Sequence, residues 1–216
     1  MNKTLIVKLC FLIHIVLALS SCAKPTVKVC FTPAGNCTDA IVHEIKQAKT
    51  EVLVQAYSFT SRPIADAVTK VKEAGVAVEI ILDLSDDFAR NSASYVSSLK
   101  EIPIYLDAQH AIADNNIIII DKATVVTGSF KFTDKAEGKN ASNLLIIKSG
   151  TVVAAYVDNW NQHKKHSVEY KKNGLYKDEK KEPGQKKKGP LIRQQGRGLW
   201  GKQFSGQCLR PAASIG

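Results

Sequence analysis

Histidine is the first residue type to consider for chemistry, because it serves as general base, nucleophile and metal ligand near neutral pH. His110 lies four residues before Asp114. In an extended segment that offset spans about 13 Å, which favours a loop or strand-edge residue over a substitute nucleophile. His163 and His166 are three residues apart at a lysine-rich helix end, where cations suit the helix dipole and metal binding is the minor alternative. His43 is expected to be a partly exposed helix residue.

A second set of polar residues surrounds an entirely apolar run, Ile117–Ile120. The four isoleucines predict a strand buried on both faces, as in the centre of a sheet. The polar residues before and after this run are Asp114, Asn116, Asp121, Ser129, Lys131 and Ser142.

Four stretches of the sequence together resemble one known family. They are Cys30–Pro33, Gln55–Ser61 followed by Ile64 and Ala65, Ile117–Asp121, and Thr127–Phe130 followed by Phe132 and Thr133. In this order, over roughly residues 26–165, they are similar to the phospholipase D superfamily, specifically its small bacterial members with a single motif, which include secreted nucleases and phospholipase D-like proteins. The resemblance implies an α/β fold with a mixed β-sheet flanked by helices and one motif per chain.

The catalytic motif of that family is only partly matched. The family motif is His-x-Lys-x4-Asp, followed six residues later by Gly-Ser-x-Asn. Laid on this sequence without a gap, it places Asp114 at the histidine, Asn116 at the lysine and Lys131 at the asparagine, while Ser142 stands where small members carry a glutamate. In the family, the histidine attacks phosphorus and forms a phosphohistidine, a second histidine protonates the leaving oxygen, and lysine and asparagine neutralise the phosphoryl oxygens.

These substitutions predict a site that is inactive or severely impaired. A carboxylate at position 114, with a reference pKa of about 3.9, is ionised at neutral pH and repels a phosphodiester. Asp114 and Lys131 are instead expected to face each other as an ion pair. Asp121 and Ser129 keep the family residue types. Asp121 either supports the catalytic residue or caps a buried strand end, and Ser129 can still donate a hydrogen bond to a phosphate oxygen.

Hydrophobic periodicity predicts alternating strands and helices within a single domain, residues 24–168. Strands are expected at Thr26–Phe31, Glu51–Tyr57, Val76–Leu82, Ile102–Leu106, Ile117–Ile120, Thr124–Thr127 and Leu144–Ile147, and helices at Thr38–Lys49, Ile64–Ala74, Asn91–Lys100 and Thr151–Lys164. The second and third strands, with the helix between them, form a βαβ unit.

The formal charge of +10 is confined to the C-terminal part of the chain. Residues 164–216 hold fourteen Lys and Arg against four Asp and Glu, which leaves sixteen of each in residues 1–163. A neutral body excludes a uniformly cationic DNA-coating protein. Residues 169–216, rich in Lys, Gly, Gln and Pro, are expected to be a disordered basic tail, either merely solvated or attracted to anionic lipid, nucleic acid or cell-wall polymer.

Residues 1–23 have the layout of a secretory signal peptide. The apolar run of about 15 residues contains Lys8 and His14, and it is short for a membrane span, which needs about 20. Either cleavage follows Ala23, or Cys22 is acylated in a bacterial lipoprotein signal. The expected location is therefore outside the cell or in the bacterial cell envelope.

Three cysteines follow the signal segment, and two of them can form a disulfide if the compartment is oxidising. Cys30 and Cys37 flank a turn-rich stretch and are disulfide candidates, although two unpaired thiols are the alternative. Cys208 is left over. No cofactor or metal is expected.

Three functions from different classes follow. The chain is a degenerate phospholipase D relative that binds an anionic partner, an active phosphodiesterase with a non-standard site, or a dimeric envelope protein that binds anionic lipid or polymer through its tail. A homodimer is expected because family members with one motif per chain build a single site across the two-fold axis. The motif does not separate phospholipid from nucleic acid, because both share the phosphodiester.

Overall fold

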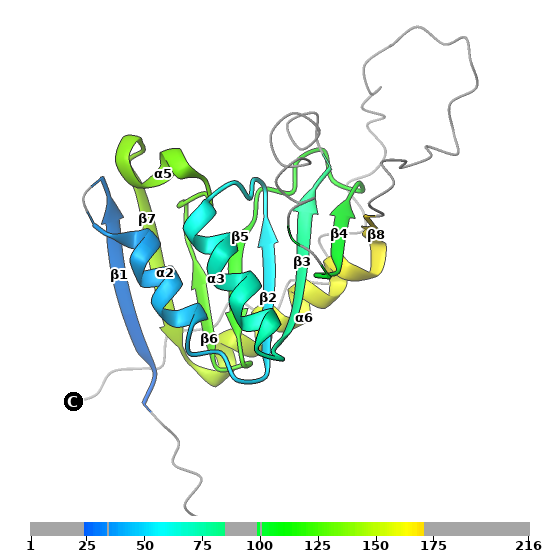
Figure 1. Ribbon diagram of the computed structural model, residues 1–216, viewed down its shortest axis with the longest axis horizontal. Helices are drawn as coiled ribbons and strands as arrows, with labels where there is room; N and C mark the ends of the chain where they lie inside the picture. Colours follow the sequence, from blue (N-terminus) through cyan, green and yellow to red (C-terminus); the bar gives the residue numbers. More distant parts are fainter. Residues whose placement is uncertain (1–23, 34, 85–98, 100, 171–216) are drawn as a thin grey trace, which may run out of the picture. The chain divides into compact units, whose positions relative to one another are not determined.

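The isoleucine run lies in the interior of an eight-stranded mixed sheet (Figure 1). The computed structural model of the chain describes residues 24–33, 35–84, 99 and 101–170. The strands are β1 (Thr26–Thr32), β2 (Glu51–Ala56), β3 (Ala77–Asp83), β4 (Ile104–Asp107), β5 (Asn116–Ile120), β6 (Thr124–Thr127), β7 (Ser142–Lys148) and β8 (Val168–Glu169). Their order is β1-β7-β6-β5-β2-β3-β4-β8. Every residue of β5 is buried, as expected for a strand with a neighbour on each side and helices on both faces.

Strand direction determines which residues share an end of the sheet. β2, β3 and β4 run parallel to one another, and β5 runs antiparallel to β2. Asn116 at the start of β5 therefore pairs with Ala56 at the end of β2, and Asp83 pairs with Asp107. We call this end, marked by Ala56, Asp83, Asp107 and Asn116, the carboxyl end of the sheet.

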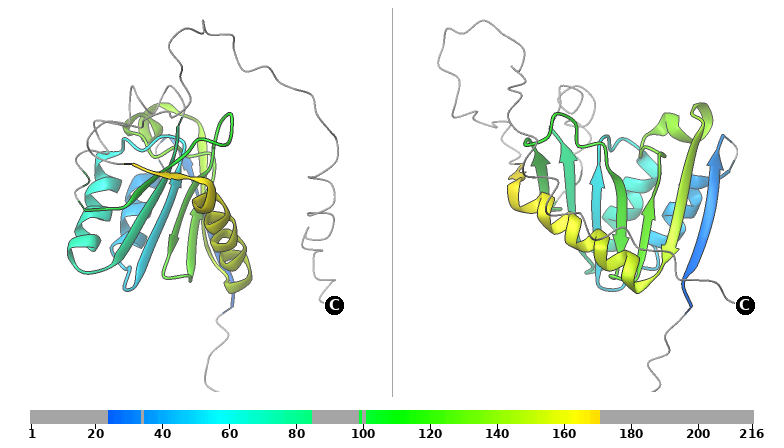
Figure 2. Two further views of the ribbon diagram at one scale, coloured as in Figure 1. Left: turned by 90° about the vertical axis from the view of Figure 1, so that its right-hand side faces the viewer. Right: turned by 180° about the vertical axis from the view of Figure 1, so that it is seen from behind.

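Helices cover both faces of the sheet. α2 (Cys37–Ile45) and α3 (Arg62–Glu73) pack on one face, and α6 (Gly150–His166) crosses the other (Figures 1 and 2). α5 (Asp134–Lys139) is a short helix between β6 and β7. Alternate residues of the strands feed two hydrophobic clusters, one with α2 and α3 and a smaller one with α6. The Trp160 indole of the smaller cluster donates a 3.1 Å hydrogen bond to the Val54 carbonyl, which ties α6 to β2.

The βαβ unit follows from its local sequence. α3 has a proline in its first turn, which is the position where a missing N–H costs nothing. Its buried residues recur at helical spacing, namely Ile64, Ala65, Ala67, Val68 and Val71. Gly75 follows the helix with a φ of 93°, a conformation that glycine adopts without steric cost. The chain then enters β3 parallel to β2, as predicted.

The structure confirms the α/β class and the mixed sheet, and it differs from the sequence prediction at the ends of elements. α5 and β8 were not predicted, because α5 buries only Ala136 and β8 is two exposed residues long. The helix predicted at Asn91–Lys100 lies outside the described residues, apart from Leu99, as do the signal segment and nearly all of the basic tail. Within the described residues, no helix has the length and apolar character needed to cross a membrane.

Cys30 and Cys37 are joined by a disulfide, with their Cα atoms 5.9 Å apart. The bond links β1 to the first residue of α2. Cys37 is fully buried against the cluster that contains both helices, so the disulfide closes the turn between strand and helix at the edge of the core.

Candidate functional site

The motif positions other than Asp121 lie toward the carboxyl end of the sheet. Asp114 lies just before β5, and Asn116 is the first residue of that strand. Asn116 is buried, and its Oδ1 has no hydrogen-bond partner among the described residues. An amide here carries no charge, so the position that would neutralise a phosphoryl oxygen in the family contributes only a dipole.

Asp114 and Lys131 form the ion pair expected from the sequence. Lys131 Nζ lies 3.5 Å from Asp114 Oδ1, and the two side chains are 39% and 55% exposed. The same Nζ lies 4.3 Å from the centroid of the Tyr57 ring, within cation–π range. The ammonium group is therefore engaged by a carboxylate and an aromatic face at the position where a phosphate-binding asparagine is expected.

Ser129 is held by the neighbouring strand. Its hydroxyl accepts a 3.0 Å hydrogen bond from the backbone N–H of Asn143, and its own N–H donates to Asn143 Oδ1 at 3.2 Å. Gly128 has a φ of 149°, and a Cβ at this position would lie 2.3 Å from the Asn143 carbonyl oxygen. Glycine is thus required by the close approach of β7. Ser142 opens that strand and donates its backbone N–H to Thr32 Oγ1.

Asp121 lies at the opposite end of β5 from the other motif positions. It lies five positions after Asn116, an offset that corresponds to about 16 Å along a strand. Its carboxylate accepts backbone hydrogen bonds from Lys49, Thr50 and Glu51 at 2.8–3.1 Å. Burial alone would raise the pKa of Asp121, but these hydrogen bonds outweigh it and hold the pKa below its usual value. This is the capping role that the sequence left open, and it is too far from position 114 to orient a group there.

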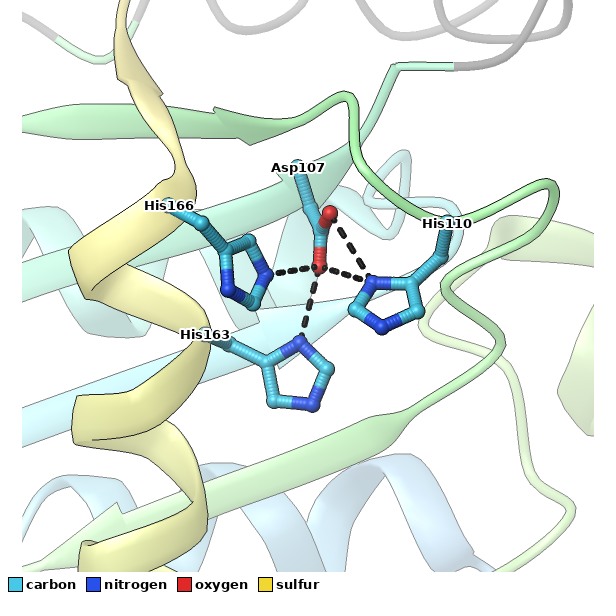
Figure 3. Close-up of side chains that lie close together, drawn as sticks. All are labelled: Asp107, His110, His163 and His166. Carbon is cyan, nitrogen blue, oxygen red and sulfur yellow. Dashed lines mark hydrogen bonds and ion pairs between the residues drawn. The ribbon is translucent and has the colours of Figure 1, made fainter. Parts of the chain in front are cut away.

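A cluster of four polar side chains occupies the same end of the sheet at β4. Asp107, the last residue of β4, is contacted by three histidines (Figure 3). His163 Nδ1 lies 2.8 Å from Asp107 Oδ2, His166 Nε2 lies 3.2 Å from it and His110 Nδ1 lies 3.0 Å from it. We call Asp107, His110, His163 and His166 the histidine cluster.

The Asp107 carboxylate is fully buried and ionised. Burial acts to raise its pKa, but hydrogen bonds from His163, His166, the Gln109 backbone N–H and His110 outweigh the burial and hold the pKa far below its usual value. An ionised carboxylate only accepts hydrogen bonds, so each contacting ring nitrogen is the donor.

The histidine cluster was not predicted from the sequence. His110 was assigned to a loop or strand edge, and His163 and His166 to a helix end, and both placements hold. The missing step was spatial: the two residues of β8 pair with β4 and bring the end of α6 to the end of that strand. The sequence does carry a faint signal, because Asp107 and His110 are three residues apart, as are His163 and His166.

One segment connects the histidine cluster with the motif positions. Residues 108–115 run from β4 to β5, carrying His110 near one end and Asp114 near the other. Between them, the backbone N–H of Ala113 donates a 2.6 Å hydrogen bond to Oδ2 of the buried Asp83. β4 and β5 are separated by β3 and β2, so the two sites are three strand spacings apart, or about 14 Å.

The fold and the motif positions define a phosphodiesterase scaffold, and sequence comparison gives its family. The chain belongs to the phospholipase D superfamily, because the family profile described as "Cardiolipin synthase, PLD-like domain" matches residues 41–164.

Individual relatives agree with this assignment. The chain is 35% identical over 147 residues to a phospholipase D of Rickettsia prowazekii, covering 68% of this chain and 72% of the relative. It is 24% identical over 157 residues to a mitochondrial cardiolipin hydrolase of Xenopus tropicalis, covering 62% and 74%. Among solved structures, the phospholipase D family member Nuc from Salmonella typhimurium superposes with a TM-score of 0.64 at 32% identity, covering 68% of this chain and 99% of that one.

Proposed function

We propose that this chain is an exported phospholipase D-family protein that keeps the scaffold for engaging a phosphodiester but is inactive or severely impaired in hydrolysing it. The observation that carries the proposal is the Asp114–Lys131 ion pair at the family's nucleophile position. The pair fills with two mutually satisfied charges the place where the family needs a nucleophile and a donor to phosphate.

The chemistry of the pair argues against turnover by the family route. That route requires an imidazole that attacks phosphorus and leaves as a neutral base. Asp114 offers an anion that repels the substrate, and the positive charge of Lys131, which is needed to offset this repulsion, is already paired with Asp114. Asn116 supplies no positive charge to the developing phosphoryl oxygens. Four polar positions of the family site thus differ together, although Gly128 and the surrounding strands keep the family geometry.

The ligand group that we expect the chain still to bind at the motif positions is the phosphodiester. The named relatives act on phospholipid, and the shared chemical feature is a phosphodiester between two organic groups. Two buried amides at this end of the sheet, Asn116 and Gln55, have polar atoms without a partner among the described residues, namely Asn116 Oδ1 and both polar side-chain atoms of Gln55. We propose that these groups contact a ligand or a second copy of the chain. With one motif per chain, a homodimer would bring two such positions together.

Export is supported by two independent features. The N-terminal residues have the composition of a signal peptide, and Cys30 and Cys37 form a disulfide of the kind that persists in oxidising compartments.

The test is hydrolysis of bis(4-nitrophenyl) phosphate by the chain and by a variant that carries Asp114→His, Asn116→Lys, Lys131→Asn and Ser142→Glu together. We expect activity only in the four-fold variant. A matched three-fold variant that retains Asp114 should stay inactive, which would isolate the missing nucleophile. Clear turnover by the unmodified chain contradicts the proposal, and its loss in His110→Gln would then assign the activity to the histidine cluster.

A further inference from the structure

We propose that the histidine cluster binds one divalent transition-metal ion of the zinc class. One ligand atom from each of Asp107, His110, His163 and His166 lies within 4.8 Å of every other (Figure 3). Three imidazole nitrogens and one carboxylate oxygen are a donor set that suits zinc and its neighbours in the first transition row.

The spacing of these donors is close to that of a tetrahedral site. Zinc bonds of about 2.0–2.1 Å place tetrahedral ligand atoms about 3.3 Å apart. Asp107 Oδ2 already lies 2.8, 3.0 and 3.2 Å from the three ring nitrogens. The three ring centroids form a nearly equilateral triangle, with sides of 5.0, 5.2 and 5.3 Å. The ligand atoms all lie within 4.8 Å of one another, so the imidazoles need to move closer together by up to about 1.5 Å to meet one ion.

Hydrogen bonding brings the three imidazoles together on one carboxylate. Three ring nitrogens converge on Oδ2, and the His110 Nδ1 is shared with Oδ1, which also accepts the Gln109 backbone N–H. The same three nitrogens can bind a cation once each carries its proton on the other ring nitrogen or has lost it. The ion then takes one lone pair from each ligand atom.

The scaffold holds three of the four ligands on a helix or a strand. Asp107 ends β4, and His163 and His166 occupy the last turn of α6. The pairing of Leu106 with Val168 joins the two elements next to the cluster. The Gln109 N–H that donates to Oδ1 orients the carboxylate, as groups behind metal ligands commonly do.

The surrounding charges favour a cation. The negative end of the α6 dipole points toward the cluster, and Asp83 pairs with Asp107 in the register of the sheet. Lys164, which follows His163 on the helix, pairs with Glu79 and is therefore largely neutralised, and Lys165 is exposed. The imidazoles of His110 and His166 are 34% and 28% exposed, which provides a route of entry.

The test is a titration of the purified chain, without a polyhistidine tag, with Zn²⁺ in competition with a chromophoric chelator. We expect one Zn²⁺ per chain, undisturbed by excess Mg²⁺, which prefers oxygen ligands. His163→Gln and His110→Gln should each lower the affinity at least about 100-fold, since loss of a mere orienting group costs about 10–100-fold. Zn²⁺ should raise the Tm of the unmodified chain but not that of the variants.

His43→Gln is the matched control, because His43 is exposed on α2 and outside the cluster. It should bind Zn²⁺ as the unmodified chain does. Equal affinity of the unmodified chain and both cluster variants would overturn the proposal, as would a thiolate charge-transfer band with Co²⁺, which would move the site to a cysteine. If His163→Gln does not fold, as judged by circular dichroism, His110→Gln decides, because His110 lies outside the helices and strands.

Discussion

At the scale of single residues, the Asp114–Lys131 pair lies in partial contact with water. Its 3.5 Å separation and its exposed fractions of 55% and 39% place it among surface ion pairs, which contribute about 0.2–1 kcal/mol. We predict a coupling energy of this size in a cycle of Asp114→Ala, Lys131→Ala and the double variant, measured by urea unfolding. A coupling indistinguishable from zero would show that the pair does not form in solution.

Asp121 should matter more for stability than the pair does. Asp121→Asn should lower the free energy of unfolding by about 1–3 kcal/mol at neutral pH, because the amide retains one acceptor oxygen for four backbone and hydroxyl donors. Asp66→Asn, on the exposed face of α3, is the control and should change stability by less than about 0.5 kcal/mol.

The contribution of Asp121 should depend on pH. Its pKa is lower in the folded chain than its ordinary value of 3.8, so its stabilisation is complete above that value and is lost as the pH falls through the folded pKa. The difference in unfolding free energy between the unmodified chain and Asp121→Asn should therefore shrink below about pH 4. A difference that stays constant down to pH 2 would contradict this account.

The sequence was informative at residues whose positions follow from chain order. An ungapped alignment across one hairpin was sufficient to bring Asp114 and Lys131 together, because β5 and β6 are joined by a tight turn. It was not sufficient for Asp107 and His163, whose contact depends on residues 56 positions apart and on a strand of two residues. Periodicity reports which face of an element is buried, and it does not report which two element ends meet.

At the scale of elements, α2 depends on a cap from a distant helix. Asn36 makes no side-chain cap, and Glu137 of α5 instead accepts the backbone N–H groups of Cys37 and Thr38 and the Thr38 hydroxyl, at 2.7–3.1 Å. Glu137→Ala should therefore lower the free energy of unfolding by about 1–2 kcal/mol in thermal or urea unfolding.

The matched control for the cap is Glu73→Ala, because Glu73 is exposed at the end of α3. Equal effects of the two variants on the free energy of unfolding would mean that Glu137 makes no specific capping contribution. The cap also explains why α5 was not predicted. This helix has six residues and only one of them is buried, so its sequence has no clear hydrophobic periodicity, and its contacts with the start of α2 stabilise it instead.

At the scale of the whole molecule, the positive charge is concentrated in the C-terminal residues, and we predict that anionic surfaces bind there. Residues 171–216 hold twelve Lys and Arg against three Asp and Glu. Binding to vesicles that contain phosphatidylglycerol should weaken at least about tenfold between about 50 and 200 mM salt and should disappear when residues 171–216 are removed, a cut that leaves β8 intact. Binding that survives this truncation would place the anion-binding surface on the folded domain.

The closure of the sheet by β1 has a consequence for how the chain folds. Residues 26–32 pair with residues 142–148, so the first strand has no partner until nearly all of the folded domain has been synthesised. Contacts between such distant segments slow folding, because loop-closure entropy is lost before pairing compensates for it. The first strand can therefore join the sheet only after residues 142–148 have been synthesised, and until then the growing sheet lacks one of its edge strands.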